Sequence, residues 1–348
     1  MSKSLGFYEL MEKVVETGIC SGCGACVAVC PFKDVLEYAD ERPILIGECK
    51  NCGICVRVCP RYNVQVDELD KLAFGRLRTP DEVFGVYKSI YASRSLDGEI
   101  LEKGQDGGVA TTILKSALES GLIDGAIVSG VNSSTPWLPT PLVARSGEEV
   151  LLSAGTRYSY SPNLTALKKA VDEGLKRIAF VGTPCQILAV RRMQKANIKK
   201  FTNPIVFTIG LFCSKSFSYP GLMVEKIQEG FGIDLMDVAK INIKGRMLVY
   251  LKNGDVVKIP LKEIREYANP RCSYCDDFSA ELADISLGGI GLNDWNLTIV
   301  RTDRGREVFD QVVKGNCLEV KSAEKMDKSL KLLKQLSIMK RRNFRRVN

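Results

Sequence analysis

The sequence predicts an α/β (α+β) body preceded by a small N-terminal domain rich in cysteine. Eight of the thirteen cysteines lie in the first sixty residues. Beyond about residue 80, strand-like and helix-like stretches alternate along the chain, as in α/β proteins. The length of 348 residues exceeds one average domain, and 45% apolar with 26% charged content is typical of folded proteins. We therefore expect two compact parts.

The N-terminal cysteines form two copies of one motif. Cys20-x2-Cys23-x2-Cys26-x3-Cys30-Pro31 recurs as Cys49-x2-Cys52-x2-Cys55-x3-Cys59-Pro60. This spacing is typical of bacterial ferredoxins with two [4Fe–4S] clusters, in which the fourth cysteine of each run binds the other cluster. Zinc sites lack this interlocked pattern. The predicted ligand sets are Cys20, Cys23, Cys26 and Cys59 for one cluster, and Cys49, Cys52, Cys55 and Cys30 for the other.

Composition excludes several other classes. The chain has no histidine, which excludes Ser–His and Cys–His catalysis, histidine-ligated haem and Rieske clusters. Residues 1–19 lack the apolar core of a signal peptide, so reduced thiols in a cytoplasmic protein are expected rather than disulfides. No run of about 18 apolar residues occurs, so no direct membrane span is expected. Much of the net charge of +8 lies between Lys321 and Arg346, without the interleaved aromatics of a nucleic-acid surface, and no nucleic-acid partner is expected.

Hydrophobic periodicity places the elements of the body. Residues 1–65 are assigned to the ferredoxin-like domain, 66–82 to a polar connector, 83–320 to the body and 321–348 to a basic helix or tail. The predicted strands are Val83–Ala92, Gly125–Val131, Arg177–Gly182, Pro204–Leu211, Ala239–Ile243 and Met247–Leu251. The predicted helices are Val109–Ser120, Asn163–Glu173, Gln186–Lys195, Pro220–Gly230 and Lys325–Met339.

Three glycine-bearing turns lie where these elements end or begin, at residues 105–108, 154–162 and 181–185. Gly107 and Gly108 precede a helix with Thr111 in its first turn, which could present amides to a phosphate. The alternative is that each glycine only ends an element. Neither a G-x-G-x-x-G nor a phosphate-loop motif is present, so a standard NAD site is not expected.

Five cysteines remain in the body and the tail: Cys185, Cys213, Cys272, Cys275 and Cys317. The first four could hold a third cubane cluster. A C-x2-C redox pair, a zinc site or buried inert thiols are the alternatives that spacing leaves open. Cys317 has no evident partner and is interpreted as an ordinary cysteine.

Together these motifs resemble the coenzyme F420 hydrogenase/dehydrogenase β-subunit family, and within it the type found in F420H2 dehydrogenases. The resemblance covers nearly the whole chain. It depends on the doubled ferredoxin motif, Asp106-Gly-Gly108, Gly155-Thr-Arg-Tyr-Ser159, Gly182-Thr-Pro-Cys-Gln186, and Cys272-x2-Cys275-Asp276 followed by Ala283-Asp-Ile-Ser-Leu-Gly288. One departure is that Gly289-Ile-Gly291 intervenes before Asp294-Trp295.

The resemblance implies a flavoprotein body that binds FAD and a third [4Fe–4S] cluster. It implies that Cys185, Cys213, Cys272 and Cys275 ligate this body cluster. The residues implied at FAD are those of the glycine turns, namely Asp106, Gly107, Gly108, Thr111, Gly155, Thr156, Arg157, Tyr158, Ser159, Ser161, Gly182, Thr183, Pro184, Gly288 and Gly289.

The implied activity is oxidation of F420H2, with hydride passing to FAD and single electrons passing through three clusters to a partner. No protein catalytic residue is needed. The partner would be ferredoxin or another component of a membrane-bound quinone- or methanophenazine-reducing complex, on which the chain would dock peripherally. The alternatives are an F420–ferredoxin oxidoreductase or hydrogenase β subunit, a polyferredoxin-like carrier without a substrate site, and a relative acting on another reducible substrate, such as a pigment side chain.

Two basic regions are candidates for recognition. The deazaflavin carries a phosphate and a polyglutamate tail, which could bind a cluster formed by Arg191, Arg192, Lys195, Lys199 and Lys200, with Arg157 nearer FAD; the alternative is a solvated helix face. The C-terminal helix, with Leu330, Leu333, Leu336 and Met339 at helical spacing, could dock on an acidic subunit.

Overall fold

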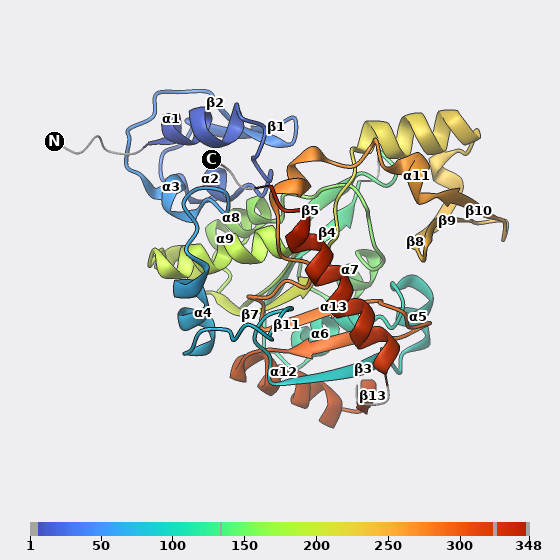
Figure 1. Ribbon diagram of the computed structural model, residues 1–348. Coiled ribbons are helices and arrows are strands. Elements are labelled where there is room, and N and C mark those ends of the chain that lie inside the picture. Colours follow the sequence, from blue (N-terminus) through green and yellow to red (C-terminus); the bar gives the residue numbers. More distant parts are fainter. Residues whose placement is uncertain (1–5, 133, 323–325, 346–348) are drawn as a thin grey trace.

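The centre of the protein is an eight-stranded mixed sheet (Figure 1). The computed structural model describes residues 6–132, 134–322 and 326–345. The strand order is β13-β3-β12-β11-β7-β6-β4-β5; the four central strands are parallel and the others pair antiparallel. The strands are β3 (Ser89–Ser95), β4 (Gly125–Val131), β5 (Pro139–Ala144), β6 (Ile178–Gly182), β7 (Ile205–Leu211), β11 (Ile285–Gly288), β12 (Asn296–Val300) and β13 (Leu318–Ser322).

Helices cover both faces of this sheet, and alternate strand residues point to different cores. On β6, Ile178 and Phe180 join one core while Ala179 and Val181 join the other. Both faces of the central strands are thus apolar, as expected for buried parallel strands. The first core includes α8 (Asn163–Asp172), α9 (Pro184–Lys195) and α10 (Lys199–Thr202); the second includes α6 (Val109–Glu119), α7 (Gly147–Leu152) and α12 (Asp303–Lys314).

The N-terminal domain repeats one unit. Gly24 and Gly53 both adopt left-handed backbone, with φ of 79° and 73°, and each precedes a five-residue helix. This conformation is accessible to glycine without the steric cost that a Cβ atom imposes. The elements are α1 (Phe7–Leu10), the π-helical η1 (Met11–Val15), α2 (Ala25–Val29), β1 (Leu36–Ala39), β2 (Arg42–Leu45) and α3 (Ile54–Val58).

This domain shares a core with the body. Ala25, Val29 and Val58 are buried in the same cluster as the α8 and α9 side chains. The predicted polar connector contains helix α4 (Val66–Phe74), and its Leu69 is buried in that cluster too. The expectation of a polar connector missed this helix, because one buried leucine among charges gives little periodic signal.

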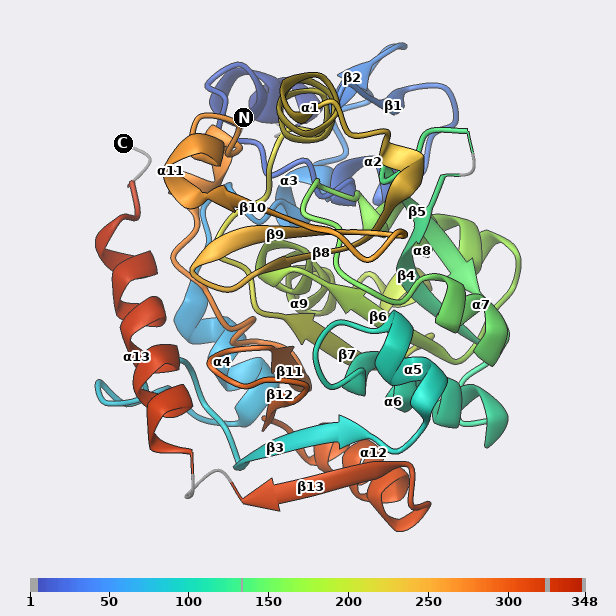
Figure 2. The ribbon, with the colours of Figure 1, turned by 90° about the vertical axis from the view of Figure 1, so that its right-hand side faces the viewer.

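A second, three-stranded sheet has a core of its own at the edge of the body (Figure 2). It consists of β8 (Val238–Ile243), β9 (Arg246–Leu251) and β10 (Val256–Pro260) in antiparallel order. The π-helix η2 (Tyr219–Glu229), the 3-10 turn η3 (Leu235–Asp237) and α11 (Leu261–Ile264) pack against it. Near the body, α5 (Gly98–Lys103) follows β3, and the 3-10 helix η4 (Pro270–Tyr274) follows α11.

The C-terminal helix α13 (Asp327–Arg342) lies along the body (Figures 1 and 2). Leu333 is fully buried, and Leu330 and Leu336 pack with it against Phe278 and Leu297. These leucines form part of the body core, so the expectation that this face docks on another subunit is wrong. Only Met339 of the four predicted contacts is exposed, at 51%.

Most predicted body elements are confirmed within two residues, including β4 and the start of α8. The strand predicted from Val83 begins at Ser89 instead. The predicted helix over Pro220–Gly230 is of the π type. The predicted start of the C-terminal helix, Lys325, lies outside the described residues.

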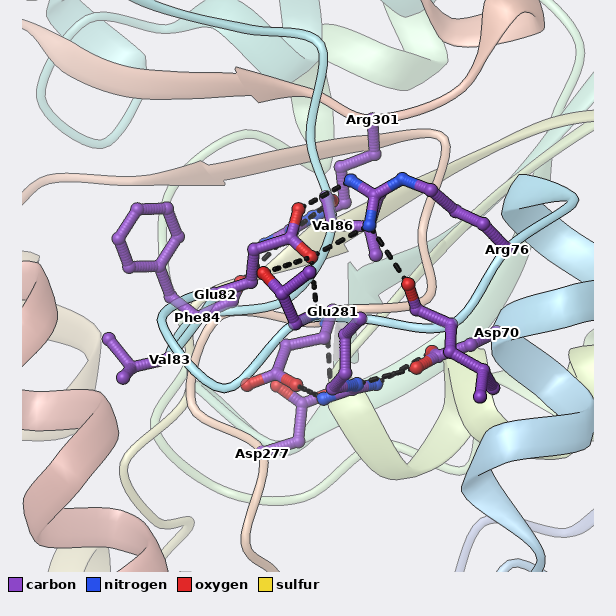
Figure 3. Close-up of polar contacts among 12 residues, drawn as sticks. Asp70, Arg76, Glu82, Val83, Phe84, Val86, Asp277, Glu281 and Arg301 are labelled. Atoms are coloured by element: carbon purple, nitrogen blue, oxygen red, sulfur yellow. Dashed lines mark hydrogen bonds and ion pairs between the residues drawn. The ribbon is translucent and has the colours of Figure 1, made fainter.

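A buried ion-pair network joins α4, the loop after Cys275 and α13 (Figure 3). Glu281 is 3% exposed and accepts hydrogen bonds from Arg78 and from Arg341 of α13. Arg78 also binds Asp70 of α4 at 2.6 Å. The N-terminal segment, the body and the C-terminal helix are therefore held together at one carboxylate.

Candidate redox site

The two N-terminal cysteine sets each gather in space. We call Cys20, Cys23, Cys26 and Cys59 the first quartet, and Cys49, Cys52, Cys55 and Cys30 the second quartet. All four members of the second quartet line one pocket with about 310 Å³ of space not filled by atoms, open solvent included. The grouping places Cys30 with the later motif, as the interleaved pattern of ferredoxins requires.

The first quartet is assembled by the reverse exchange. Burial raises the pKa of the Cys23 thiol, and the neighbouring Cys59 and Cys20 add to this rise. Burial likewise raises the pKa of Cys59 to about 11, with Cys20 contributing. Cys59 of the second motif therefore lies beside the cysteines of the first.

The third set, the body quartet, comes from three separate elements. Cys185 lies in the first turn of α9, Cys213 follows β7, and Cys272 and Cys275 lie in and just after η4. All four line a second pocket with about 360 Å³ of space not filled by atoms, open solvent included. Its other lining residues are Ser21, Arg61, Tyr160, Thr183, Pro184, Ser216, Arg271 and Lys340.

Polar groups point at the sulfur atoms of these sets. The amides of Gly22 and Asn51 lie 3.5 and 3.4 Å from the Sγ atoms of Cys20 and Cys49, at equivalent places in the two repeats. The Ser216 amide donates to Cys272 at 3.4 Å. Such contacts orient the ligands and tune a cluster. Among the described residues, no three His, Cys, Asp or Glu side chains are placed to hold a single metal ion.

The three quartets form a line. Burial raises the pKa of Cys20 and of Cys23, and in both cases Cys185 of the body quartet adds to the rise. At the other end, burial and its own quartet raise the pKa of Cys26, and Cys55 of the second quartet contributes. The order is therefore body quartet, first quartet, second quartet.

The glycine turns meet around Asp106. A Cβ atom on Gly289 would lie 1.6 Å from Oδ2 of Asp106, so no larger residue fits there without displacing the carboxylate. Tyr158 also lies close, since Asp106 adds to the rise that burial causes in its pKa. Lys244 of the small sheet pairs with Asp106 at 3.2 Å. Two predicted turns and the small sheet thus converge at one carboxylate.

Several buried polar atoms near these turns have no hydrogen-bond partner among the described residues. They are Nε2 and Oε1 of Gln105, Nε of Arg157 and Oγ of Ser159. Burial lowers the pKa of Arg157 to about 10, and its Nη1 donates only to the carbonyls of Ser153, Ala154 and Gly155. A buried cation bound only to carbonyls suits an anionic ligand such as a pyrophosphate. These residues fit a flavin dinucleotide.

Comparison with known proteins agrees with this architecture. Residues 12–70 match a 4Fe-4S dicluster domain. Residues 90–168 and 175–326 match the N-terminal and C-terminal parts of the coenzyme F420 hydrogenase/dehydrogenase β subunit. The chain is 39% identical over 262 residues to the coenzyme F420 hydrogenase β subunit of Methanosarcina barkeri, covering 74% of this chain and 89% of the relative.

The chain belongs to the coenzyme F420 hydrogenase/dehydrogenase β-subunit family. It is also 32% identical over 339 residues to the F-type component of the F420H2 dehydrogenase of Methanosarcina mazei, covering 95% of this chain and 92% of that protein. A chain in the solved F420-reducing [NiFe] hydrogenase complex of Methanosarcina barkeri has the same fold, with a TM-score of 0.73, 38% identity, and coverage of 76% of this chain and 92% of that one. The protein is thus an oxidoreductase with an N-terminal 4Fe–4S dicluster domain.

The remaining predicted family contacts fall into two groups. Gly107 and Gly108 lie against β3 and α5, and Thr111 is buried one turn into α6. Thr183 and Pro184 instead line the body quartet pocket, next to Gly182 at the end of β6. The segment from Gly155 through Thr156 to Ser161 runs between the groups, because Tyr160 reaches Cys185 at 3.5 Å. Gly288 packs on the ring of Phe212.

The predicted basic cluster on α9 is used internally. Arg191 pairs with the buried Asp284 at 3.0 Å. Arg192 donates to the carbonyls of Arg57, Tyr62 and Asn63, and Lys195 pairs with Glu68 of α4. The structure therefore does not support this cluster as the binding site for the deazaflavin tail. Its charges join the N-terminal domain to the body.

Sequence reasoning missed four pocket residues: Arg61, Arg271, Ser216 and Lys340. Arg61 directly follows the Cys59-Pro60 signal, which could have pointed to it. Lys340 is distant from every cysteine in the sequence and carries no motif, so only the packing of α13 brings it to the pocket.

Replacing Arg157 with methionine is expected to weaken FAD binding by about 10- to 100-fold, as expected for loss of a hydrogen bond from a charged group. The matched control is Arg145→Met, which removes a surface arginine paired with Glu173. Titration of flavin-free protein with FAD gives both affinities. Equal affinities in the two variants would exclude Arg157 from the flavin site.

Proposed function

We propose that the chain oxidises reduced coenzyme F420 and delivers the electrons one at a time to a partner protein. The observation that carries this proposal is the line of three cysteine quartets, which starts beside the glycine turns and ends at the surface. Cys52 of the second quartet is exposed. Such a line suits directional transfer better than storage.

The chain's own residues would hold each group in place. The Asp106 and Gly155–Ser161 turns would hold FAD, which when bound exchanges two electrons with a hydride donor and one with a cluster. The three quartets would each hold a [4Fe–4S] cluster. Tyr160 would separate the flavin region from the body quartet, because it belongs to a flavin turn and also lines the quartet pocket. Hydride transfer needs no protein base, in keeping with a chain without histidine.

Organisation favours the dehydrogenase type within the family. A match over 95% of the chain leaves too few residues unmatched to omit the dicluster domain, so the dehydrogenase component of Methanosarcina mazei shares it. The proposed role is electron input to an F420H2:quinone or methanophenazine dehydrogenase complex. None of the helices within the described ranges could cross a membrane, so attachment would be through other subunits.

The test is an anaerobic spectrum before and after addition of F420H2. We expect bound flavin, about twelve irons per chain, and bleaching of both flavin and iron–sulfur absorbance. A polyferredoxin-like carrier predicts iron without flavin and no response to F420H2. Bleaching that requires added ferredoxin as the only competent acceptor would favour the ferredoxin oxidoreductase instead.

A further inference from the structure

The pocket of the body quartet receives charge from both ends of the chain. Arg61 comes from the end of the N-terminal cysteine motif, and Lys340 comes from the last turn of α13. Both lie outside the two β-subunit family matches at 90–168 and 175–326. The body's own Arg271 is the third cation of the lining, and the described lining residues include no carboxylate.

The three cations are compensated differently. Arg271 pairs with Glu41 at 3.4 Å and donates to the Glu41 carbonyl at 2.8 Å. Arg61 donates only to the Arg271 carbonyl at 3.4 Å, and its buried Nε has no partner among the described residues. Lys340 donates to the carbonyl of Ser214. Within the described part of the chain, neither Arg61 nor Lys340 is ion-paired with a carboxylate.

The negative neighbours of these two cations are the cysteine sulfurs. Burial alone would lower the pKa of Lys340, but Cys275, Cys213 and Cys272 outweigh it, and the pKa is raised. Burial would likewise lower the pKa of Arg61, and Cys275, Cys185 and Cys272 outweigh it. A poorly solvated cation needs an anion nearby, and here the quartet is the anion.

A [4Fe–4S] cluster with four thiolate ligands is anionic and gains one more negative charge on reduction. A fixed cation beside it stabilises the reduced form more than the oxidised form, so the reduction potential rises. The uncompensated charges of Arg61 and Lys340 act more strongly in this way than Arg271, whose charge Glu41 offsets.

We propose that Arg61 and Lys340 are positioning residues that raise the reduction potential of the body cluster. The inference deepens the proposed function and rests on its assignment of a cluster to the body quartet. The N-terminal domain and α13 thereby adjust a cluster whose ligands all belong to the body.

The experiment is a redox titration of the complete, cluster-loaded protein followed by electron paramagnetic resonance. The signal of the body cluster is the one that Cys275→Ser removes. In Lys340→Gln and in Arg61→Gln its midpoint should become more negative by roughly a tenfold change in the ratio of reduced to oxidised cluster, about 59 mV for one electron. Lys340→Arg should restore the midpoint.

Matched controls remove surface charges from the same segments. Lys331→Gln lies on α13 about 13 Å from Lys340 along the axis, and Lys71→Gln lies on α4; both side chains are exposed. Neither control should shift the midpoint. Because the two proposed charges come from different segments, loss of iron in one variant leaves the other as the test.

The outcomes distinguish the two proposals. An unshifted midpoint in either iron-replete variant, or shifts equalled by the controls, would overturn the role of the charges while leaving the cluster in place. Loss of the third cluster in both variants would assign Arg61 and Lys340 to its assembly, which also overturns it. About eight irons in the unmodified protein would instead refute the body cluster itself.

Discussion

Replacing Cys275 with serine is expected to remove one cluster and to prevent F420H2 from reducing the other two. Cys275 lines the body pocket, and its pKa, raised to about 11 mainly by burial, shows a thiol withdrawn from water. Iron should fall from about twelve to about eight per chain. The two N-terminal clusters should remain reducible by a chemical reductant, because their eight ligands are unchanged.

Cys317→Ser is the matched control for this change. Cys317 lies outside the three quartets and its thiol faces the carbonyl of Gly315. This variant should keep its iron and its response to F420H2. Iron analysis with anaerobic spectra measures both effects. Retention of about twelve irons in Cys275→Ser, with clusters still bleached by F420H2, would remove Cys275 from the electron path.

Replacing Glu281 with alanine is expected to lower the free energy of unfolding by about 3–5 kcal/mol. The carboxylate is buried and binds both Arg78 and Arg341. Without it, Arg341 loses its carboxylate partner and α13 loses an anchor to the body (Figure 3). Denaturation of the loaded protein under anaerobic conditions, followed by circular dichroism, gives the difference.

The control is Glu307→Ala on α12. Glu307 pairs with Arg304 at 3.0 Å, and its side chain is 65% exposed. Such surface pairs contribute about 0–1 kcal/mol. Similar losses in the two variants would show that the Glu281 network adds no more than an ordinary surface pair.

Local sequence signals predicted the elements of the body well, because they depend on neighbouring residues. The turn before α6 and the strand Gly125–Val131 are examples. The N-terminal quartets follow from spacing for the same reason, since short loops limit where each thiol can lie. The body quartet needed the family resemblance, because Cys185, Cys213 and Cys272 are far apart in the chain and meet only through the order of strands β6, β7 and β11.

Charge patterns were the least informative signal. The sequence places Arg191, Arg192 and Lys195 on one helix, which suits an anion site, yet the structure uses them against Asp284, backbone carbonyls and Glu68. Lys340 shows the reverse case. It belongs to an ordinary basic tail, and tertiary packing alone brings it to the body cysteines.

The shared core between the N-terminal domain and the body limits how such a protein can evolve. Ala25, Val29 and Val58 bury the same surface as α8 and α9. Exchanging residues 1–65 for an unrelated ferredoxin would leave that surface exposed to water, even if the new unit carried the same two clusters. The electron outlet is thus not an interchangeable cassette on a tether. Its sequence must change in step with the helices beneath it, and no domain movement is needed to bring donor and acceptor together.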